Sequence, residues 1–228
     1  MTALTIDVVS DVVCPWCFIG KRHLDRALEL WAAEQPDSPV IVRWQPFFLS
    51  PDVAENGEPY RPFLERKFGG PEKLAAIWRN ISAAGQNAGI EFAFEKIERR
   101  ANTLNAHRLI HHAQKVMRSG IHSDGAGDTA IGRLIEGLFA AQFLEGRFIA
   151  DNTVLASVAG ECGMDREAVQ RYMDSTEDAE EVRAAEAQAH AMGISGVPYF
   201  IFNQRLAASG AQAPQALLNA MREAAQPA

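Results

Sequence analysis

The chain has 228 residues, of which 47% are hydrophobic and 22% are charged, and its formal net charge is −7. A chain of this kind can bury a full core as one large domain, or as a small domain that carries an insertion. The negative charge and the lack of any basic run argue against a nucleic-acid or anionic-membrane surface. Three cysteines do not make the disulfide framework of a small secreted protein. We therefore expect partners that are proteins or small molecules, and we leave a homodimer open.

The N-terminal residues lack the features of a targeting signal. No basic segment precedes the early apolar stretch, which Asp7 and Asp11 interrupt, so a secretory signal peptide is not expected. No window approaches the ~18 apolar residues that a membrane span needs. These features predict a cytoplasmic protein that does not contact a membrane. A reducing compartment holds a dithiol mostly reduced, which favours a reductase or isomerase over a net oxidant.

The first half of the fold is expected within residues 1–50. A buried strand is predicted over 5–9, a helix over 14–33 and a second strand over 40–44. A helix between two strands acts as a crossover, which demands that the strands pair in parallel. The segment therefore reads as one strand-helix-strand unit.

The pattern changes over residues 51–175. A loop rich in proline, glycine, asparagine and acids comes first, and helical patterns with almost no strand signal follow. Apolar residues recur at helical spacing, as in Leu74, Ile77, Trp78 and Ile81. The segment is too long for a connection, so we interpret it as a large all-helical insertion.

Residues 176–228 return to the sheet. A helix that ends at Gly193 is followed by a hairpin around Asn203-Gln204, and Pro214 starts a closing helix. The expected fold class is therefore α/β, with a central mixed sheet, flanking helices and the helical insertion.

The segment Cys14-Pro15-Trp16-Cys17 carries the clearest chemistry. Two thiols three positions apart at the first turn of a helix can close a disulfide and reopen it. Pro15 suits the first helical position, which places Cys14 at the N-cap. There its sulfur is expected to face free backbone N–H groups and the positive end of the helix dipole, which favour the thiolate. Cys14 is the predicted attacking thiol and Cys17, one turn into the helix, the resolving thiol.

Zinc binding is the alternative for two cysteines at this spacing. A closed zinc site needs two further ligands at matching spacing, and the chain offers only Cys162 and six scattered histidines. His107 and His111 share a helix face, but Arg108 stands where a metalloprotease motif needs glutamate. We expect no metal and no tightly bound cofactor, and we interpret Cys162 as an inert thiol.

Four stretches together resemble one known family. The order and separation of these stretches are similar to those of the FrnE-like subfamily of the DsbA family of thioredoxin-fold oxidoreductases. They are residues 10–22 (Ser-Asp-Val-Val-Cys-Pro-Trp-Cys-Phe-Ile-Gly-Lys-Arg), Asn102-Thr103 with Ala106-His107, residues 193–198 (Gly-Ile-Ser-Gly-Val-Pro), and Ser209-Gly210-Ala211-Gln212. The resemblance implies a thioredoxin fold and thiol–disulfide exchange on protein or small-molecule substrates.

The resemblance also implies a proline beside the dithiol. In the thioredoxin fold the position of Pro198 carries a cis proline that faces the two sulfurs, and the backbone of Val197 is then placed to pair with an extended substrate. A trans proline that merely begins the strand is the alternative.

Further roles are carried over from the family to single residues. Asp7 corresponds to a buried acid on the first strand that takes the proton of Cys17, although an exposed or capping aspartate fits the sequence equally well. Asn102 and His107 are expected at the start of a helix that leans over the dithiol, in substrate contact or cysteine activation. An N-cap and a packed histidine are the alternatives. Trp16 either offers an apolar platform to substrate or packs against the insertion.

Two other functions stay open at this stage. The related kappa-class glutathione transferases and 2-hydroxychromene-2-carboxylate isomerases share the insertion and bind glutathione, but they usually carry a single serine or cysteine at the helix start. Glutathione or another thiol is a candidate co-substrate here, with Ser209 and Gly210 as the place for its γ-glutamyl end. A redox-switched holdase, in which the disulfide only changes surface exposure, ranks third.

Overall fold

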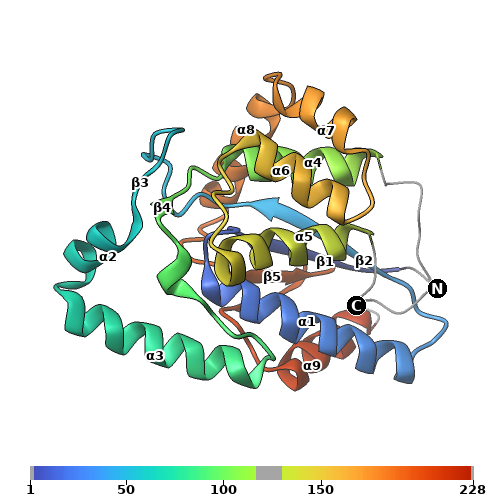
Figure 1. The fold of residues 1–228 in the computed structure, drawn as a ribbon. Helices are drawn as coiled ribbons and strands as arrows, with labels where there is room; N and C mark the ends of the chain where they lie inside the picture. The colour runs from blue at the N-terminus through green and yellow to red at the C-terminus, as the bar shows by residue number, and fades with distance from the viewer. Residues whose placement is uncertain (1–2, 117–129, 227–228) are drawn as a thin grey trace.

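The computed structural model describes residues 3–116 and 130–226 (Figure 1). Two sheets and a set of helices make up this part of the chain. In order they are β1 (Leu4–Ser10), α1 (Pro15–Glu34), β2 (Val40–Pro46), β3 (Glu58–Pro59), α2 (Tyr60–Phe68), α3 (Pro71–Asn87), η1 (Phe94–Lys96), β4 (Arg99–Arg100), α4 (Leu104–Val116), α5 (Ala130–Ala140), the π-helical turn η2 (Ala141–Glu145), α6 (Asn152–Glu161), α7 (Arg166–Met173), α8 (Ala179–Ala191), β5 (Tyr199–Phe202), β6 (Leu206–Ser209) and α9 (Pro214–Ala225).

The main sheet has four strands in the order β2-β1-β5-β6. β1 and β2 run parallel, with Val8 opposite Trp44, because α1 carries the chain back between them. β5 is antiparallel to β1, and β6 is antiparallel to β5. The mixed sheet flanked by helices confirms the fold class expected from the sequence.

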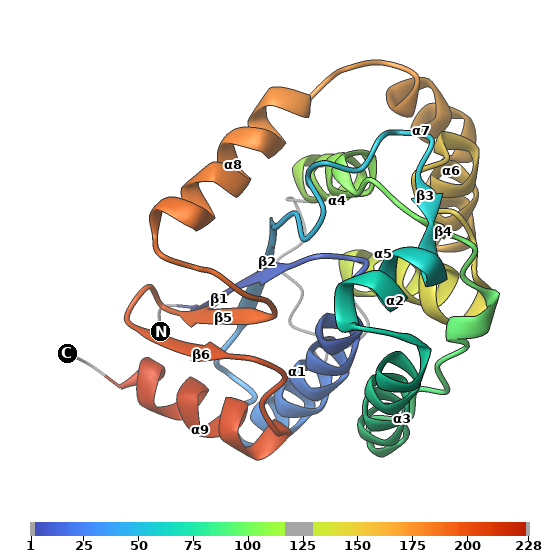
Figure 2. The ribbon, with the colours of Figure 1, turned by 90° about the vertical axis from the view of Figure 1, so that its left-hand side faces the viewer.

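Alternation along β1 assigns its side chains to two different helical layers. Ile6 and Val8 belong to the large core that includes residues of α1 and α9, whereas Val9 packs with Ala189 of α8. Figure 2 shows α8 on one side of the sheet and α1 and α9 on the other. A side chain on β1 therefore meets the helix of the two cysteines only if it lies on the face of Ile6 and Val8.

The hairpin between β5 and β6 turns at the expected pair. Asn203 and Gln204 both have positive φ, of 48° and 55°, and they are the central residues of a turn closed by a hydrogen bond from Arg205 N to Phe202 O at 3.0 Å. The Asn203 side chain also accepts a hydrogen bond from the backbone of Thr5 and donates one to the carbonyl of Ala224. One residue thus ties the hairpin to β1 and α9.

The segment between β2 and α8 is mostly helical, as expected, but it also contains a short ribbon. β3 and β4 pair antiparallel through only two residues each, with Glu58 opposite Arg100. Strands of this length leave no alternating pattern in the sequence, which is why the all-helical expectation missed them. Arg100 is buried there and pairs with Glu58 at 2.6 Å.

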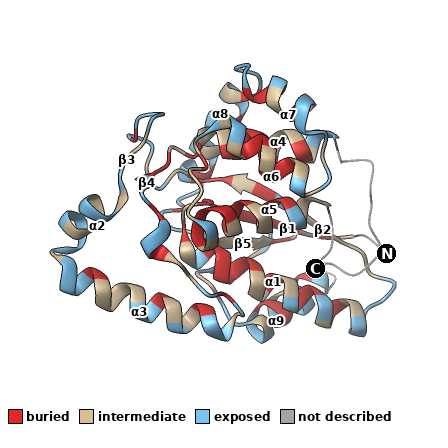
Figure 3. Cartoon of the chain, in the orientation of Figure 1, coloured by how far each residue is buried: buried red, intermediate tan, exposed pale blue. Residues whose placement is uncertain are grey.

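The inserted helices and the sheet share one hydrophobic core. Residues of α4, α5 and α6 belong to the same buried cluster as α1 and β1. Figure 3 shows the buried residues concentrated in this central region, whereas α2 and α3 stand to one side and are mainly intermediate or exposed. The Gln114 side chain of α4 bonds both backbone groups of Trp44 at 2.7 and 3.0 Å, which closes the outer edge of β2.

The start of α1 is fixed to α5 by aromatic packing and by charge. Phe18 is fully buried and stacks on Phe139 with ring centroids 5.1 Å apart, an arrangement that adds about 0.5–1.5 kcal/mol to the burial of the rings. Lys21 and Arg22 both pair with Glu136, at 2.7 and 2.6 Å. The helix that carries the cysteines is therefore held against the insertion.

None of the helices in the described ranges is long and apolar enough to cross a membrane.

Gly20 of α1 allows a close approach to Pro198. A Cβ at position 20 would lie 2.8 Å from Pro198 Cγ and 3.3 Å from the Phe200 ring. Real Cβ atoms essentially never lie as close as the first of these contacts. The proline and the helix can therefore meet only if residue 20 has no side chain.

We predict that Gly20→Ala lowers the free energy of unfolding by about 1 kcal/mol. Alanine favours the helix by about 0.5–1 kcal/mol, but overpacking against the proline ring costs about 1–3 kcal/mol. Urea unfolding measures the difference. Gly196→Ala is the control, because its Cβ would meet nothing within 4 Å, and it should change stability by less than about 0.5 kcal/mol. Equal stability of the two variants would contradict the tight contact.

Candidate active site

Cys14 and Cys17 lie where the sequence predicted, at the N-terminus of α1. Cys14 is the N-cap residue and Pro15 the first helical residue. The turn from β1 closes through a hydrogen bond from Cys14 N to Asp11 O at 3.0 Å, and Cys17 N donates to Cys14 O at 3.0 Å. Both cysteines are free thiols. Cys14 is 5% exposed and Cys17 is 1% exposed, so Cys14 is the more accessible sulfur.

The Cys14 sulfur faces the carbonyl of Val197 and not the helix N–H groups. The Cys14 side chain makes no capping hydrogen bond. Its Sγ instead donates to Val197 O at 3.7 Å, across 183 positions of sequence. The expectation of direct N–H contacts was therefore wrong, although Cys14 still sits at the positive end of the helix dipole. The Val197-Pro198 peptide bond is cis.

The Cys17 thiol is held in its protonated form. Burial raises its pKa well above the ordinary thiol value, and the hydrogen bond and negative charge of Cys14 raise it further. The Ser10 side chain and the backbone of Asp11 act in the opposite direction and lower it. Cys17 must therefore lose a proton inside the protein before it can attack a disulfide.

Asp7 lies on the face of the sheet opposite α1. It alternates with Ile6 and Val8, which face the helix, and its carboxylate accepts a hydrogen bond from Gln45 at 3.2 Å. The sheet thus stands between Asp7 and Cys17. Asp11 is instead the fully buried carboxylate of the loop that leads into the dithiol.

Asn102 and His107 fit the alternatives of a helix cap and a packed histidine, and their role toward substrate or cysteine stays a prediction. Asn102 Oδ1 accepts a hydrogen bond from Leu104 N at the start of α4, and its amide donates to Val53 O. His107 is buried, but its Nε2 lies 3.3 Å from Asp11 Oδ1. Asn102 therefore caps the helix, while His107 reaches the loop before Cys14.

Sequence reasoning missed three residues around the thiols. Ser10 and Asp11 lie within the recognised motif but were not assigned a role, and only their position at the end of β1, shortly before Cys14, could have indicated one. Burial and then the charge of Cys14 raise the pKa of Tyr60, which marks a neutral phenol near the nucleophile. Tyr60 lies in the insertion, and no sequence pattern connects it to Cys14.

Ser209 and Gly210 lie in a turn attached to the Pro198 loop. Gly210 N donates to Pro198 O at 2.8 Å. Gln212 O lies 2.9 Å from His23 Nδ1, which joins the same turn to α1. Ser209 is exposed at the end of β6.

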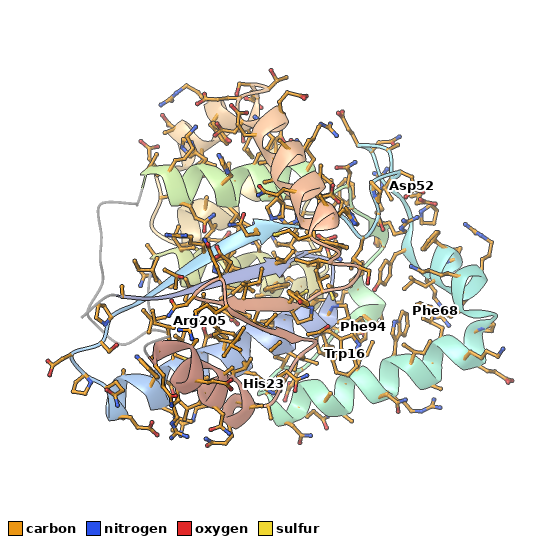
Figure 4. All side chains as sticks on the ribbon, turned by 180° about the vertical axis from the view of Figure 1, so that it is seen from behind. Trp16, His23, Asp52, Phe68, Phe94 and Arg205 are labelled. Atoms are coloured by element: carbon orange, nitrogen blue, oxygen red, sulfur yellow. The ribbon has the colours of Figure 1, made fainter. Side chains whose placement is uncertain are left out.

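Trp16 is exposed while its neighbour Phe18 is buried. The Trp16 side chain is 41% exposed, and Figure 4 shows it on the side of the molecule that carries α2 and α3. The indole therefore borders the dithiol as an apolar surface, and Phe18 packs into the insertion.

Metal-ligating side chains do not gather in the part of the chain that the structure describes. No group of three or more His, Cys, Asp or Glu residues is placed to hold an ion there.

One protein-family model matches nearly the whole chain. The model for a DsbA-like thioredoxin domain matches residues 5–222, which include both cysteines and Pro198. The chain belongs to the DsbA-like thioredoxin family. The probable DsbA oxidoreductase SCO1869 from Streptomyces coelicolor is 27% identical, with a TM-score of 0.82 over 99% of this chain and 92% of that chain.

Two further solved structures share the fold at lower identity. One is a 2-hydroxychromene-2-carboxylate isomerase, 18% identical with a TM-score of 0.62 over 96% of this chain and 95% of that chain. The other is the cytosolic disulfide reductase DsbM from Pseudomonas aeruginosa with GSH, also 18% identical, with a TM-score of 0.59 over 96% and 95%. The DsbA-like architecture thus occurs in both a disulfide reductase and an isomerase.

We predict that the buried Cys17 thiol makes the reduced protein less stable at high pH. A thiol with a raised pKa stays protonated in the folded chain where the unfolded chain has already ionised. Its contribution is therefore complete below about pH 8.5 and is lost as the pH rises toward the raised pKa. Cys14→Ser and Cys14→Ser/Cys17→Ala are compared by urea unfolding.

The stability difference between these two variants should fall by up to about 2 kcal/mol between about pH 7 and pH 10. The shared Cys14→Ser change prevents disulfide formation and cancels the effect of other titrating groups. A difference that does not change with pH would show that Cys17 ionises as easily in the folded chain as in the unfolded one.

Proposed function

We propose that the protein is a thiol–disulfide oxidoreductase that exchanges disulfides through Cys14 and Cys17. The supporting observation is that the more accessible sulfur, at the N-terminus of α1, lies against the Val197 carbonyl, and the second sulfur is buried one turn behind it. Two thiols in this arrangement carry out two successive exchange steps. The DsbA-like fold supports the same chemistry.

In the reducing direction the Cys14 thiolate attacks one sulfur of a substrate disulfide. The substrate S–S bond breaks, one substrate sulfur leaves as a thiolate, and a mixed disulfide forms on Cys14. Cys17 then loses its proton and attacks Cys14 Sγ. The second substrate sulfur leaves with its electron pair, so the substrate gains two electrons and the protein holds a Cys14–Cys17 disulfide.

Substrate binding is proposed along the Val197-Pro198 loop. Val197 lies beside the Cys14 sulfur and two residues before β5, so its backbone is placed to pair with an extended peptide in the manner of strand addition. The exposed indole of Trp16, between the two cysteines in the chain, supplies an apolar surface for the substrate. Both features suit a protein disulfide as well as a smaller one.

Glutathione is our candidate for the thiol that returns the protein to its reduced form. The Ser209-Gly210 turn is attached to the Pro198 loop and so lies near the sulfurs, and the similar DsbM structure contains glutathione. DsbM is a cytosolic reductase, which agrees with a net reducing role in the cytoplasm.

A glutathione-dependent isomerase is the second candidate, because the isomerase structure covers nearly the whole chain. Such a mechanism uses glutathione as the thiol and does not require a second cysteine. The presence of Cys17 behind Cys14 favours dithiol exchange.

We predict that Cys14→Ser abolishes the reduction of insulin disulfides, because the attacking sulfur is lost and the remaining thiol of the pair, Cys17, is buried. Cys17→Ser should instead accumulate a covalent adduct between substrate and Cys14, visible by mass spectrometry, because the resolving sulfur is missing. Cys162→Ser is the control and should keep normal activity. Normal insulin reduction by Cys14→Ser would rule the mechanism out.

We further predict that glutathione reduces the Cys14–Cys17 disulfide, with a glutathione adduct on Cys14 as the intermediate. Mass spectrometry of acid-quenched samples detects the adduct. Cys17→Ser separates the two candidate functions, since dithiol turnover stops in this variant whereas isomerase turnover of 2-hydroxychromene-2-carboxylate would continue. Isomerase activity that survives Cys17→Ser would favour the second candidate.

A further inference from the structure

Resolution by Cys17 raises a problem of proton transfer. The attacking form is the thiolate, but Cys17 is 1% exposed and burial holds it protonated. Bulk water therefore has no direct access to the proton. Asp7, the acid expected to accept it, lies on the other face of the sheet. The acceptor must come from the face of β1 that meets α1.

Ser10 is the polar side chain of β1 on that face. It follows Ile6 and Val8 at alternate positions, so its side chain points toward the layer of α1. Ser10 lowers the pKa of the Cys17 thiol, which places the hydroxyl near that sulfur, although the two make no hydrogen bond in this structure. In the described part of the chain, Ser10 Oγ is the buried side-chain oxygen or nitrogen that has no hydrogen-bond partner. A buried hydroxyl of this kind calls for a reason.

Ser10 and His107 both line one small cavity. Its volume is about 10 Å³, about the room that one water molecule needs. Besides these two residues its walls are Gln45 and the mainly apolar residues Val12, Trp44, Ile110, Ile135 and Phe139. A water held between a hydroxyl and an imidazole has the polar partners that buried waters require, and the apolar walls restrict it to that position.

His107 is placed to receive a proton from this cavity. The ring is 4% exposed, and its Nε2 lies 3.3 Å from the fully buried carboxylate of Asp11. The other oxygen of that carboxylate accepts a hydrogen bond from Leu49 N at 2.8 Å, which fixes its orientation. An imidazolium formed here would gain a charge-assisted hydrogen bond to Asp11 in a site of low dielectric.

We propose that Ser10, a water in this cavity and His107 form the route by which Cys17 loses its proton during resolution. Cys17 S–H donates to Ser10 Oγ, the Ser10 hydroxyl proton passes to the water, and the water protonates His107. The Cys17 thiolate then attacks Cys14 Sγ, and the departing substrate thiolate is protonated by solvent. When the disulfide is reduced again, His107 returns the proton to Cys17 by the same groups. This inference rests on the proposed dithiol function and assigns its internal base.

A chromogenic aromatic disulfide tests the route, because it releases one coloured thiolate at each exchange step. In stopped-flow, attack by Cys14 gives a first phase whose rate depends on reagent concentration, and attack by Cys17 gives a second phase that does not. All variants are made in a Cys162→Ser background, so that only the dithiol reacts. The first phase reports the proposed function, and the second reports proton loss from Cys17.

Ser10→Ala is the decisive variant. The hydroxyl that it removes has no hydrogen-bond partner, so the folded structure and the melting temperature should be preserved. We expect an unchanged first phase and a second phase about 100-fold slower, the usual scale of general-base catalysis. His107→Gln should slow the second phase similarly. His112→Gln is the matched control on α4, because His112 stacks on Tyr172 and does not line the cavity.

The possible outcomes distinguish a failure of the proton route from a failure of the dithiol function. An unchanged second phase in Ser10→Ala overturns the proton route and leaves the dithiol function intact. Equal slowing of both phases in Ser10→Ala also overturns it, since the residue would then act on the structure of the site as a whole. Absence of both phases in the parent protein would overturn the dithiol function and the route together.

Discussion

The close contact between the start of α1 and the Pro198 loop governs the rest of the structure. Gly20 has no side chain, so the helix can lie against the proline, and the Cys14 sulfur then faces Val197 O. The insertion supports the same contact from the other side, through Phe18 on Phe139 and through Glu136 on Lys21 and Arg22. Through these contacts α5 holds the start of α1, and with it Cys14, against the loop.

Burial gives the two sulfurs different chemistry although they belong to the same helical turn. Cys14 lies at the helix end, beside a loop that can take a substrate. Cys17 is enclosed between α1, β1 and the insertion, where the loss of solvent opposes its ionisation. In the proposed exchange this asymmetry sets the order of the two steps, and the proposed proton route gives the buried polar groups Ser10, Asp11 and His107 a role in an otherwise apolar interior.

The sequence predicted the parts of this site that depend on local signals. The helix start at Pro15, the parallel strands around α1 and the hairpin at Asn203 all follow from residue type and spacing. Face assignment was harder, because Asp7 and Ser10 occupy opposite sides of one strand and only the packed helices show which side meets Cys17. The pairing of His107 with Asp11 joins residues 96 positions apart, and no local pattern records such a contact.

The separation of 183 positions between Cys14 and Val197 has a consequence for synthesis. At about 5–20 residues per second, the two cysteines are added to the chain roughly 10–40 s before Val197. During that interval the thiols exist without the loop that is proposed to guide substrates to them. The site proposed for exchange can therefore be assembled only after β5 and the residues before it have been made.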